Sequence, residues 1–189
     1  MKICIFGAAS NSIDPVYPAE TEALAKMLAQ RGHTLIFGGG KNGLMGAAAR
    51  GFTAGGGHII GVAPRFFDIP GVLYEACDEF VYPDSMRDRK KYMEDNADAF
   101  IVAPGGIGTY EEFLEVLTLK QLARHAKPIV LFNVNGFFDK LTALIEADTE
   151  TGFIRPQTRT LFRCTADKNE VIALAEAGES DVKNIRFYD

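Results

Sequence analysis

Two charged side chains and one glycine-rich segment are the residues of this sequence best suited to chemistry. Arg89 lies three residues after Met86 and four before Met93, on the apolar stripe of a predicted helix. A guanidinium on such a stripe requires a carboxylate or phosphate partner, and Glu112 is the natural candidate. Glu112 follows the segment 104–109, where glycines leave an apolar run and open a second helix. Converging N–H groups at a helix start favour an anion there, so the pattern indicates an anion site beside an Arg–Glu pair.

The segment 104–109 differs from the loop that binds a triphosphate and Mg²⁺, because it lacks the Gly-Lys-Ser/Thr ending. A single phosphate held by backbone amides and the Thr109 hydroxyl is the simpler expectation. Two structural interpretations fit the same residues. Thr109-x-x-Glu112 has the spacing of a helix capping box, which pattern alone favours, and Arg89 with Glu112 could form a plain buried ion pair. Ser85-x-x-Asp88 has the capping spacing as well.

A second glycine-rich loop, Gly38-Gly39-Gly40-Lys41-Asn42-Gly43, formally matches the dinucleotide fingerprint. It follows the second apolar run rather than the first, and the run after it ends in Val62-Ala63-Pro64 without the acid that would bind a ribose. We therefore expect Gly38, Gly39, Gly40 and Gly43 to form a packing loop or an additional phosphate contact, and not a site for NAD.

The elements that must position these residues alternate along the chain. Short apolar runs lie at 3–6, 34–37, 59–62, 99–102 and 129–132, and helical patterns at 18–31, 43–55, 86–97, 109–124, 137–150 and 165–179, before a polar tail. Uninterrupted apolar runs are typical of strands covered on both faces. The sequence thus predicts one α/β domain over residues 1–189, a Rossmann-like three-layer sandwich with a mostly parallel central sheet. Ligands of such folds bind beyond the carboxyl ends of the strands.

Composition limits the classes of function. The 189 residues carry a net charge of −5, which disfavours a nucleic-acid-binding surface. No apolar stretch approaches the ~20 residues of a membrane span, and the three cysteines, Cys4, Cys77 and Cys164, form no paired motif. Three scattered histidines give no metal-ligand spacing. We expect a cytoplasmic protein with reduced thiols, no metal, and no nucleic-acid or membrane partner.

Several motifs in order resemble those of the LOG (Lonely Guy) family, the cytokinin riboside 5′-monophosphate phosphoribohydrolases, once labelled lysine decarboxylases. The family's PGGxGTxxE is matched by residues 104–112, its GGGxxGLMG by 38–46, and its basic MHxRK element by 86–90, where Arg87 replaces the common His. A TxxQLxxHxKP-like stretch lies at 118–128. The resemblance covers nearly the whole chain.

The resemblance implies hydrolysis of the N-glycosidic bond of a nucleoside 5′-monophosphate, without metal or organic cofactor, in a homodimer or larger assembly. It places the catalytic pair on Arg89 and Glu112, a role for Glu112 that overrides the capping interpretation. It places substrate binding on Lys90, Gly105, Gly106, Ile107, Gly108, Thr109 and Thr118. Arg87 and the segment 64–84 bear on the choice of base. The Gly/Ala-rich helix at 43–55 could contribute to a subunit interface.

Three other functions fit the same fold. A carrier would hold a phosphorylated ligand without chemistry, but phosphate capture does not need the carboxylate of Glu112 beside the anion. A decarboxylase would normally need pyridoxal phosphate on a lysine, and no lysine here stands in a distinctive context. An NAD-dependent oxidoreductase is disfavoured by the missing acid after the run at 59–62.

Overall fold

The computed structural model of the chain describes residues 1–178. In this part of the chain a seven-stranded sheet has the order β4-β3-β2-β1-β5-β6-β7, and every neighbouring pair is parallel. The strands are β1 (Lys2–Phe6), β2 (Thr34–Phe37), β3 (His58–Val62), β4 (Glu79–Val81), β5 (Ala99–Val102), β6 (Ile129–Phe132) and β7 (Arg163–Thr165). All five apolar runs are strands, which confirms the predicted parallel α/β sheet.

The two strands that the apolar runs did not predict are the edge strands β4 and β7, each three residues long. Their sequences, Glu-Phe-Val and Arg-Cys-Thr, are exposed or half-buried along their length. An edge strand pairs on one side only and need not be apolar on both faces, so it leaves little signal in the sequence.

The helices are α1 (Val16–Gln30), α2 (Gly43–Gly55), α3 (Met86–Asn96), α4 (Ile107–Gln121), α5 (Asp139–Glu150) and α6 (Lys168–Glu176). Short 3₁₀ turns lie at Arg65–Phe67, Val134–Gly136 and Pro156–Thr160. Each predicted helix is present, with ends that differ by a few residues. The last residue of the predicted 165–179 helix, and the polar tail after it, lie outside the described residues.

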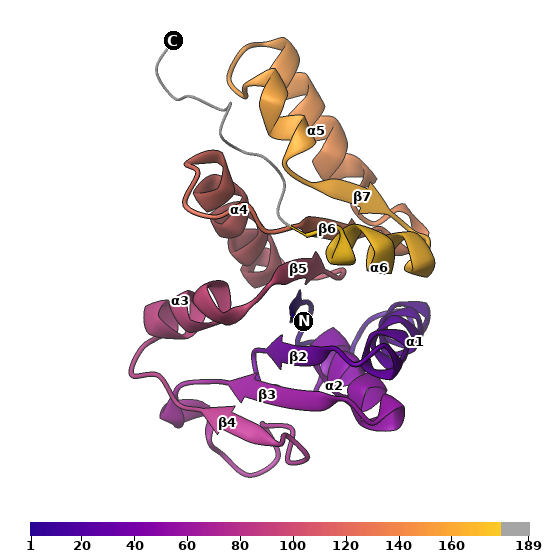
Figure 1. Cartoon of the computed structure of the whole chain (residues 1–189), viewed down its shortest axis with the longest axis vertical. Helices are drawn as coiled ribbons and strands as arrows, with labels where there is room; N and C mark the ends of the chain where they lie inside the picture. Colours follow the sequence, from indigo (N-terminus) through magenta and orange to yellow (C-terminus); the bar gives the residue numbers. More distant parts are fainter. Residues whose placement is uncertain (179–189) are drawn as a thin grey trace.

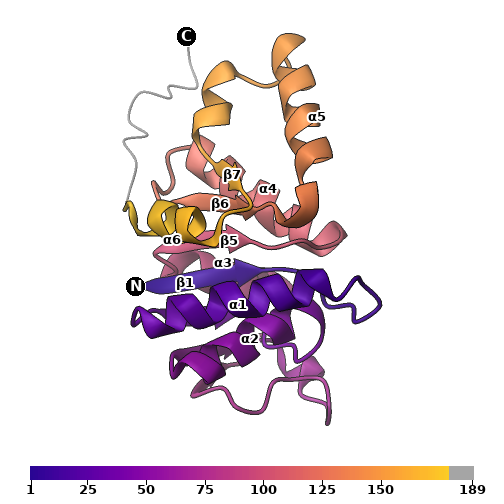
Figure 2. The same cartoon turned by 90° about the vertical axis from the view of Figure 1, so that its right-hand side faces the viewer.

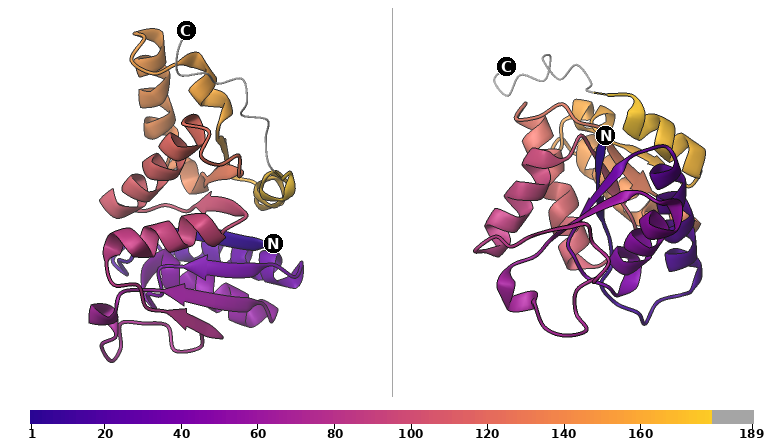
Figure 3. Two further views of the ribbon diagram at one scale, coloured as in Figure 1. Left: turned by 60° about the vertical axis from the view of Figure 1, so that its left-hand side comes forward. Right: turned by 60° about the horizontal axis from the view of Figure 1, so that its bottom comes forward.

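The helices form two layers around the sheet, which confirms the three-layer sandwich (Figure 1). Alternate side chains of each strand face opposite layers: Ile3 and Ile5 pack with α1, α2 and α6, whereas Cys4 and Phe6 pack with α3, α4 and α5. Figure 2 brings the layer of α1, α2 and α6 forward, and the left view of Figure 3 brings the opposite layer forward. Both faces of the central strands are therefore buried, as expected for a parallel sheet.

The small residues of α2 serve packing within the chain. A Cβ on Gly51 would lie 2.3 Å from the carbonyl oxygen of Glu22 in α1, and one on Gly55 would lie 2.6 Å from the Cβ of Ala29. The close approach of α1 and α2 thus explains the Gly/Ala-rich sequence that suggested a subunit interface.

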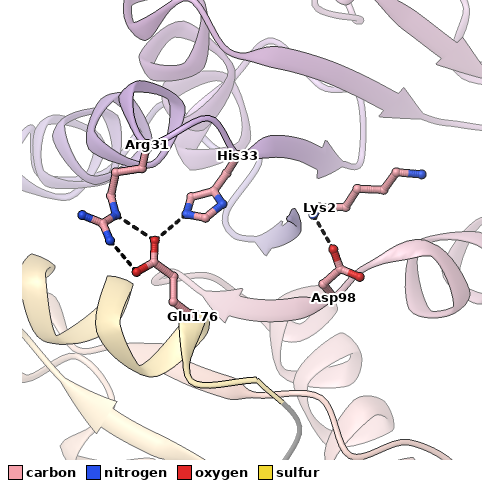
Figure 4. Close-up of polar contacts among 5 residues, drawn as sticks. All are labelled: Lys2, Arg31, His33, Asp98 and Glu176. Carbon is pink, nitrogen blue, oxygen red and sulfur yellow. Dashed lines mark hydrogen bonds and ion pairs between the residues drawn. The ribbon is translucent and has the colours of Figure 1, made fainter.

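Glu176, at the end of α6, contacts Arg31 and His33, which directly follow α1 (Figure 4). Arg31 donates to both carboxylate oxygens of Glu176, with N–O distances of 2.7 and 2.5 Å, and the Nε2 atom of His33 lies 2.8 Å from Oε1. Among the helices of residues 1–178, none has the length and hydrophobicity required to span a membrane.

Candidate active site

The strand order places the site at the centre of the sheet. The chain leaves β1 toward one helical layer, through α1, and leaves the neighbouring strand β5 toward the other, through α4. Loops after such strands diverge and leave a crevice at the carboxyl edge. A cavity of about 470 Å³ lies here, lined by residues 7–10 after β1, by Gly106, Gly108 and Thr109 after β5, and by the charged pair described next.

Arg89 and Glu112 meet in this cavity, as the sequence predicted. The Nη1 atom of Arg89 donates to Oε1 of Glu112 at 3.1 Å, and its Nε donates to the carbonyl oxygen of Val62 at 3.1 Å. The two side chains are 9% and 12% exposed. Ser85 caps α3, because its Oγ accepts the N–H of Asp88 at 3.1 Å, which fixes the first turn and directs Arg89 inward.

Burial dominates the electrostatics of Glu112. It raises the pKa of the Glu112 carboxyl above the ordinary value of 4.5, while the charge and hydrogen bond of Arg89 act in the opposite direction. Only Oε1 is bonded: in the part of the chain that the structure describes, no group donates to Oε2. Glu112 therefore presents a desolvated carboxyl with a spare oxygen to the cavity.

Gly38 leaves room for the guanidinium of Arg89, because it has no side chain. A Cβ built on Gly38 would lie 2.0 Å from Nη2 of Arg89 and 3.1 Å from its Cζ. Any larger residue would force the arginine to move. The close approach of Arg89 thus accounts for the first glycine of the 38–43 loop.

The N-terminus of α4 is open to an anion. Gly106 precedes the helix in an extended conformation, and within residues 1–178 no group accepts from the N–H groups of Ile107, Gly108 or Thr109. A Cβ built on Gly106 or Gly108 would meet no atom within 4 Å, whereas one on Gly105 would lie 2.1 Å from Oγ1 of Thr109. Three free donors and the positive end of the helix dipole face open space here.

The capping-box interpretation of Thr109 and Glu112 is wrong. Because α4 begins at Ile107, Thr109 is its third residue and is buried, and the cap position belongs to Gly106. The Glu112 carboxylate bonds to Arg89 instead of reaching back to a cap N–H.

The N-terminus of α2 is closed by the chain itself. The N–H of Gly43 donates to Oδ1 of Asn11 at 2.8 Å, and those of Leu44 and Met45 donate to the carbonyl oxygen of Ala8 at 2.8 and 3.3 Å. A Cβ on Gly43, whose φ is +58°, would lie 2.3 Å from that oxygen. Of the two roles expected for the 38–43 loop, packing is the one that accounts for Gly43.

An apolar wall completes the cavity. Phe67, Val72 and Leu73 come from the connection between β3 and β4, and Met45 and Met86 from α2 and α3. This connection is tied to the 38–43 loop, because Lys41 N–H donates to the Val72 carbonyl at 3.0 Å and Tyr74 N–H to the Gly39 carbonyl at 2.8 Å. The segment 64–84 was expected to shape a base pocket, but neither spacing nor composition identified which of its residues would do so.

Some predicted site residues lie apart from the cavity. Lys90 forms ion pairs with Glu111 and with Glu115, the latter at 2.6 Å, and does not line the cavity. Thr118 is exposed near the other end of α4, and Ile107 is 85% exposed beside the cavity mouth. Gly39 does not line the cavity either: it has φ +77°, and a Cβ there would lie 2.6 Å from the Phe80 ring. Over the same 178 residues no three His, Cys, Asp or Glu side chains are grouped so that they could hold a metal ion.

The fold and site define a doubly wound α/β protein with an anion-receptive cavity and a buried Arg–Glu pair at its topological switch point. The family model described as "Possible lysine decarboxylase" matches residues 45–175. The chain belongs to this family, and with it to the group of LOG proteins.

Named relatives support this membership. Cytokinin riboside 5′-monophosphate phosphoribohydrolase LOG2 of Arabidopsis thaliana is 35% identical over 175 residues, which cover 93% of this chain and 82% of that protein. LOG7 of the same plant, which bears the same enzyme name, is 35% identical over 184 residues, covering 97% and 85%. A molybdenum cofactor binding protein from Rippkaea orientalis has a TM-score of 0.72 at 20% identity, covering 93% of this chain and 95% of that one, which shows the common fold alone.

Proposed function

We propose that the protein hydrolyses the N-glycosidic bond of a nucleoside 5′-monophosphate, AMP or an N6-modified AMP, to the free base and ribose 5-phosphate. The observation that carries the proposal is the placement of Glu112, paired with Arg89, in the same cavity as the open N-terminus of α4. The relatives named as phosphoribohydrolases give it a reaction class.

The 5′-phosphate binds the first turn of α4. Gly105 and Gly106 shape the turn, and the N–H groups of Ile107, Gly108 and Thr109 donate to the phosphate oxygens, with the Thr109 hydroxyl beside them. Binding energy from the non-reacting phosphate then orients the ribose toward Glu112. The apolar wall of Phe67, Leu73 and Met86 receives the base.

Cleavage passes through an oxocarbenium-like ribosyl cation. The Glu112 carboxylate stabilises this cation and orients the attacking water through its spare oxygen. The water oxygen bonds to C1′ as the C1′–N bond breaks, and the electron pair of that bond leaves with the base. The water gives up one proton and the base takes up one, so that the net reaction places OH on C1′ and H on the base. Arg89 positions Glu112 and opposes the effect of burial on its pKa. This chemistry requires no metal or cofactor.

The decarboxylase named by the family model is disfavoured by the cavity lining. Among the described residues that line the cavity there is no lysine to form the Schiff base that pyridoxal phosphate requires. Lys90, one residue after Arg89, is held by two carboxylates outside the cavity.

A homodimer is part of the proposal. Ile107, Leu114 and Thr118 lie on one face of α4, and the first two are 85% and 46% exposed. A second copy packed on this face would cover the apolar side chains and bring Thr118, and Lys90 near it, into a substrate-binding position. We further propose that residues 1–189 form one domain and that the protein acts in the cytoplasm. The net charge of −5 disfavours nucleic acid as the substrate.

The test is incubation of the pure, metal-free protein with nucleoside 5′-monophosphates, nucleosides and triphosphates, with free base measured by chromatography. We expect base release from monophosphates alone. In Glu112→Gln, kcat should fall by at least ~10³-fold while nucleotide binding persists. Glu176→Gln is the matched control, because Glu176 also pairs with an arginine but lies far along the chain in α6. Tight monophosphate binding without base release would instead identify a carrier.

A further inference from the structure

A second cavity lies at the opposite edge of the sheet, where β6 and β7 begin. It has a volume of about 150 Å³ and is lined by Lys120, Pro128, Thr160, Arg163, Leu174 and Gly178, among others. Ile129 and Arg163, the first residues of β6 and β7, both line it, so it opens at the amino ends of these strands. It shares no residue with the cavity of Arg89 and Glu112.

Lys120 is a buried cation without a carboxylate partner. It lies in the last turn of α4, is 3% exposed, and donates from Nζ to the carbonyl oxygen of Lys127 at 2.8 Å. Within residues 1–178 this is its one hydrogen bond, and no acid pairs with it. Lys90 and Lys168, by contrast, both form ion pairs with glutamates. A buried ammonium without an anion is unfavourable, because one carbonyl replaces little of its hydration.

Arg163 adds a second positive charge to the same cavity. Its guanidinium has no hydrogen-bond or ion-pair partner in the described part of the chain. Burial first, and the charge of Arg163 second, lower the pKa of Lys120 to about 8. Lys120 and Arg163 therefore both line this small cavity, from α4 and β7, and none of its lining residues within 1–178 carries a carboxylate.

We propose that this second cavity binds a small oxyanion, held between the Lys120 ammonium and the Arg163 guanidinium. The volume of about 150 Å³ is sufficient for inorganic phosphate or a short carboxylate. The C-terminal end of α4 carries a partial negative charge of about −0.5, which disfavours an anion nearby. The two full positive charges of Lys120 and Arg163 outweigh it. The inference is independent of the reaction at Glu112.

The experiment follows the Lys120 side chain directly. The full chain is labelled with ¹³C at the lysine ε-carbons, and the Lys120 resonance is assigned by its loss in Lys120→Met. Titration with phosphate is expected to shift this resonance saturably and to raise the pKa of Lys120, because the bound anion stabilises the charged amine. A parallel titration with acetate separates phosphate from carboxylate binding, and chloride at equal ionic strength is the reference.

Two variants and one control complete the test. Arg163→Gln, a change at an exposed side chain, should weaken the affinity for phosphate by about tenfold, because one charge-assisted contact is lost. Lys120→Met should abolish the site and raise the melting temperature, since it removes an uncompensated buried charge. Lys91→Met, at an exposed lysine paired with Asp95, should change neither the affinity for phosphate nor the melting temperature.

Phosphate bound at α4 in the first cavity would not move the Lys120 resonance saturably, and it would persist in Lys120→Met. A Lys120 resonance that responds to phosphate and acetate no more than to chloride would overturn the proposal and leave Lys120 as a purely structural contact of Lys127. Binding of equal affinity in Arg163→Gln would also contradict it.

Discussion

Glu112 and Glu176 are both paired with arginines, and their surroundings differ in every respect that matters for chemistry. Arg31 binds Glu176 through two hydrogen bonds and His33 adds a third contact, so both carboxylate oxygens are occupied (Figure 4). Arg89 binds Glu112 through one hydrogen bond and leaves the other oxygen facing a cavity. The first arrangement completes a contact between helices, whereas the second leaves an unsatisfied group at a ligand site.

The pKa values of the two carboxyls move in opposite directions. The hydrogen bonds and charges of Arg31 and His33 lower the pKa of Glu176 to about 2, because together they outweigh the opposing effect of partial burial. Burial raises the pKa of Glu112 although Arg89 opposes it. An arginine partner therefore does not define the role of a glutamate. The balance between desolvation and pairing does, and perturbation by desolvation is typical of functional sites.

Outside the catalytic pair itself, the largest predicted effect comes from Gly38→Ala. The added Cβ would overlap Nη2 of Arg89, so the guanidinium must shift from the position in which Nη1 contacts Glu112. We expect kcat to fall by ~10²-fold with the fold retained, since a displacement of about 1 Å in a catalytic arrangement has this effect. Steady-state kinetics with circular dichroism measure both quantities.

Gly51→Ala is the matched control, because its Cβ would also clash, 2.3 Å from the Glu22 carbonyl, but between α1 and α2. It should reduce stability by about 1–3 kcal/mol and leave the kcat of the folded protein unchanged. Full activity in Gly38→Ala would show that the position of Arg89 does not matter for the reaction.

The second prediction concerns pH. Catalysis needs Glu112 ionised, so kcat should fall about tenfold per pH unit below its pKa, and this acid limb should lie above the ordinary value of 4.5. We choose kcat because the substrate phosphate itself titrates near pH ~6 and affects binding. The stability that the ionised Glu176 contributes is fully present above pH 4.5, the ordinary pKa of the group. It is lost as the pH falls through about 2, the pKa of Glu176 in the folded protein.

Activity should therefore disappear at a pH where the protein is still folded. A pH–rate profile measured beside the free energy of unfolding at each pH tests this order. Loss of activity that coincides with acid unfolding would contradict it, as would an acid limb that moves in Glu176→Gln.

The fold was predictable to the extent that burial leaves a signal. Strands covered on both faces must be apolar along their length, which identified β1, β2, β3, β5 and β6. The edge strands β4 and β7 have no such requirement. The start of α4 was misplaced because Thr109-x-x-Glu112 has the spacing of a cap, while the cap is Gly106 in an extended conformation. Glycine adopts that conformation or others equally well, so its identity alone does not fix the helix start.

The site was predictable where one residue constrains another locally. Arg89 on an apolar stripe had to be buried and therefore paired, which led to Glu112. The contact of Gly38 with Arg89 joins residues 51 positions apart, and the wall residue Phe67 comes from an irregular connection. Neither periodicity nor composition encodes such contacts. Lys120 gave no signal either, since a lysine near a helix C-terminus is ordinarily a surface residue.

The smallest effect is predicted for the structural pair. Glu176→Gln should lower the melting temperature by a few degrees near neutral pH, because the amide lacks the charge that Arg31 and His33 contact. The buried His33 contacts Glu176 through Nε2, and its Nδ1 has no hydrogen-bond partner among the described residues. The difference from the unaltered protein should vanish as pH falls toward 2, where Glu176 is itself protonated. Arg31→Gln should add little in the Glu176→Gln background, since the two act through one contact. Thermal unfolding of the double-mutant cycle measures this, with base release assayed on the same samples.

Unchanged hydrolysis in all three variants is the expected result. A loss of hydrolysis in a folded Glu176→Gln protein would mean that this pair, too, acts on the reaction, and that satisfied carboxylate oxygens are no guide to a structural role here.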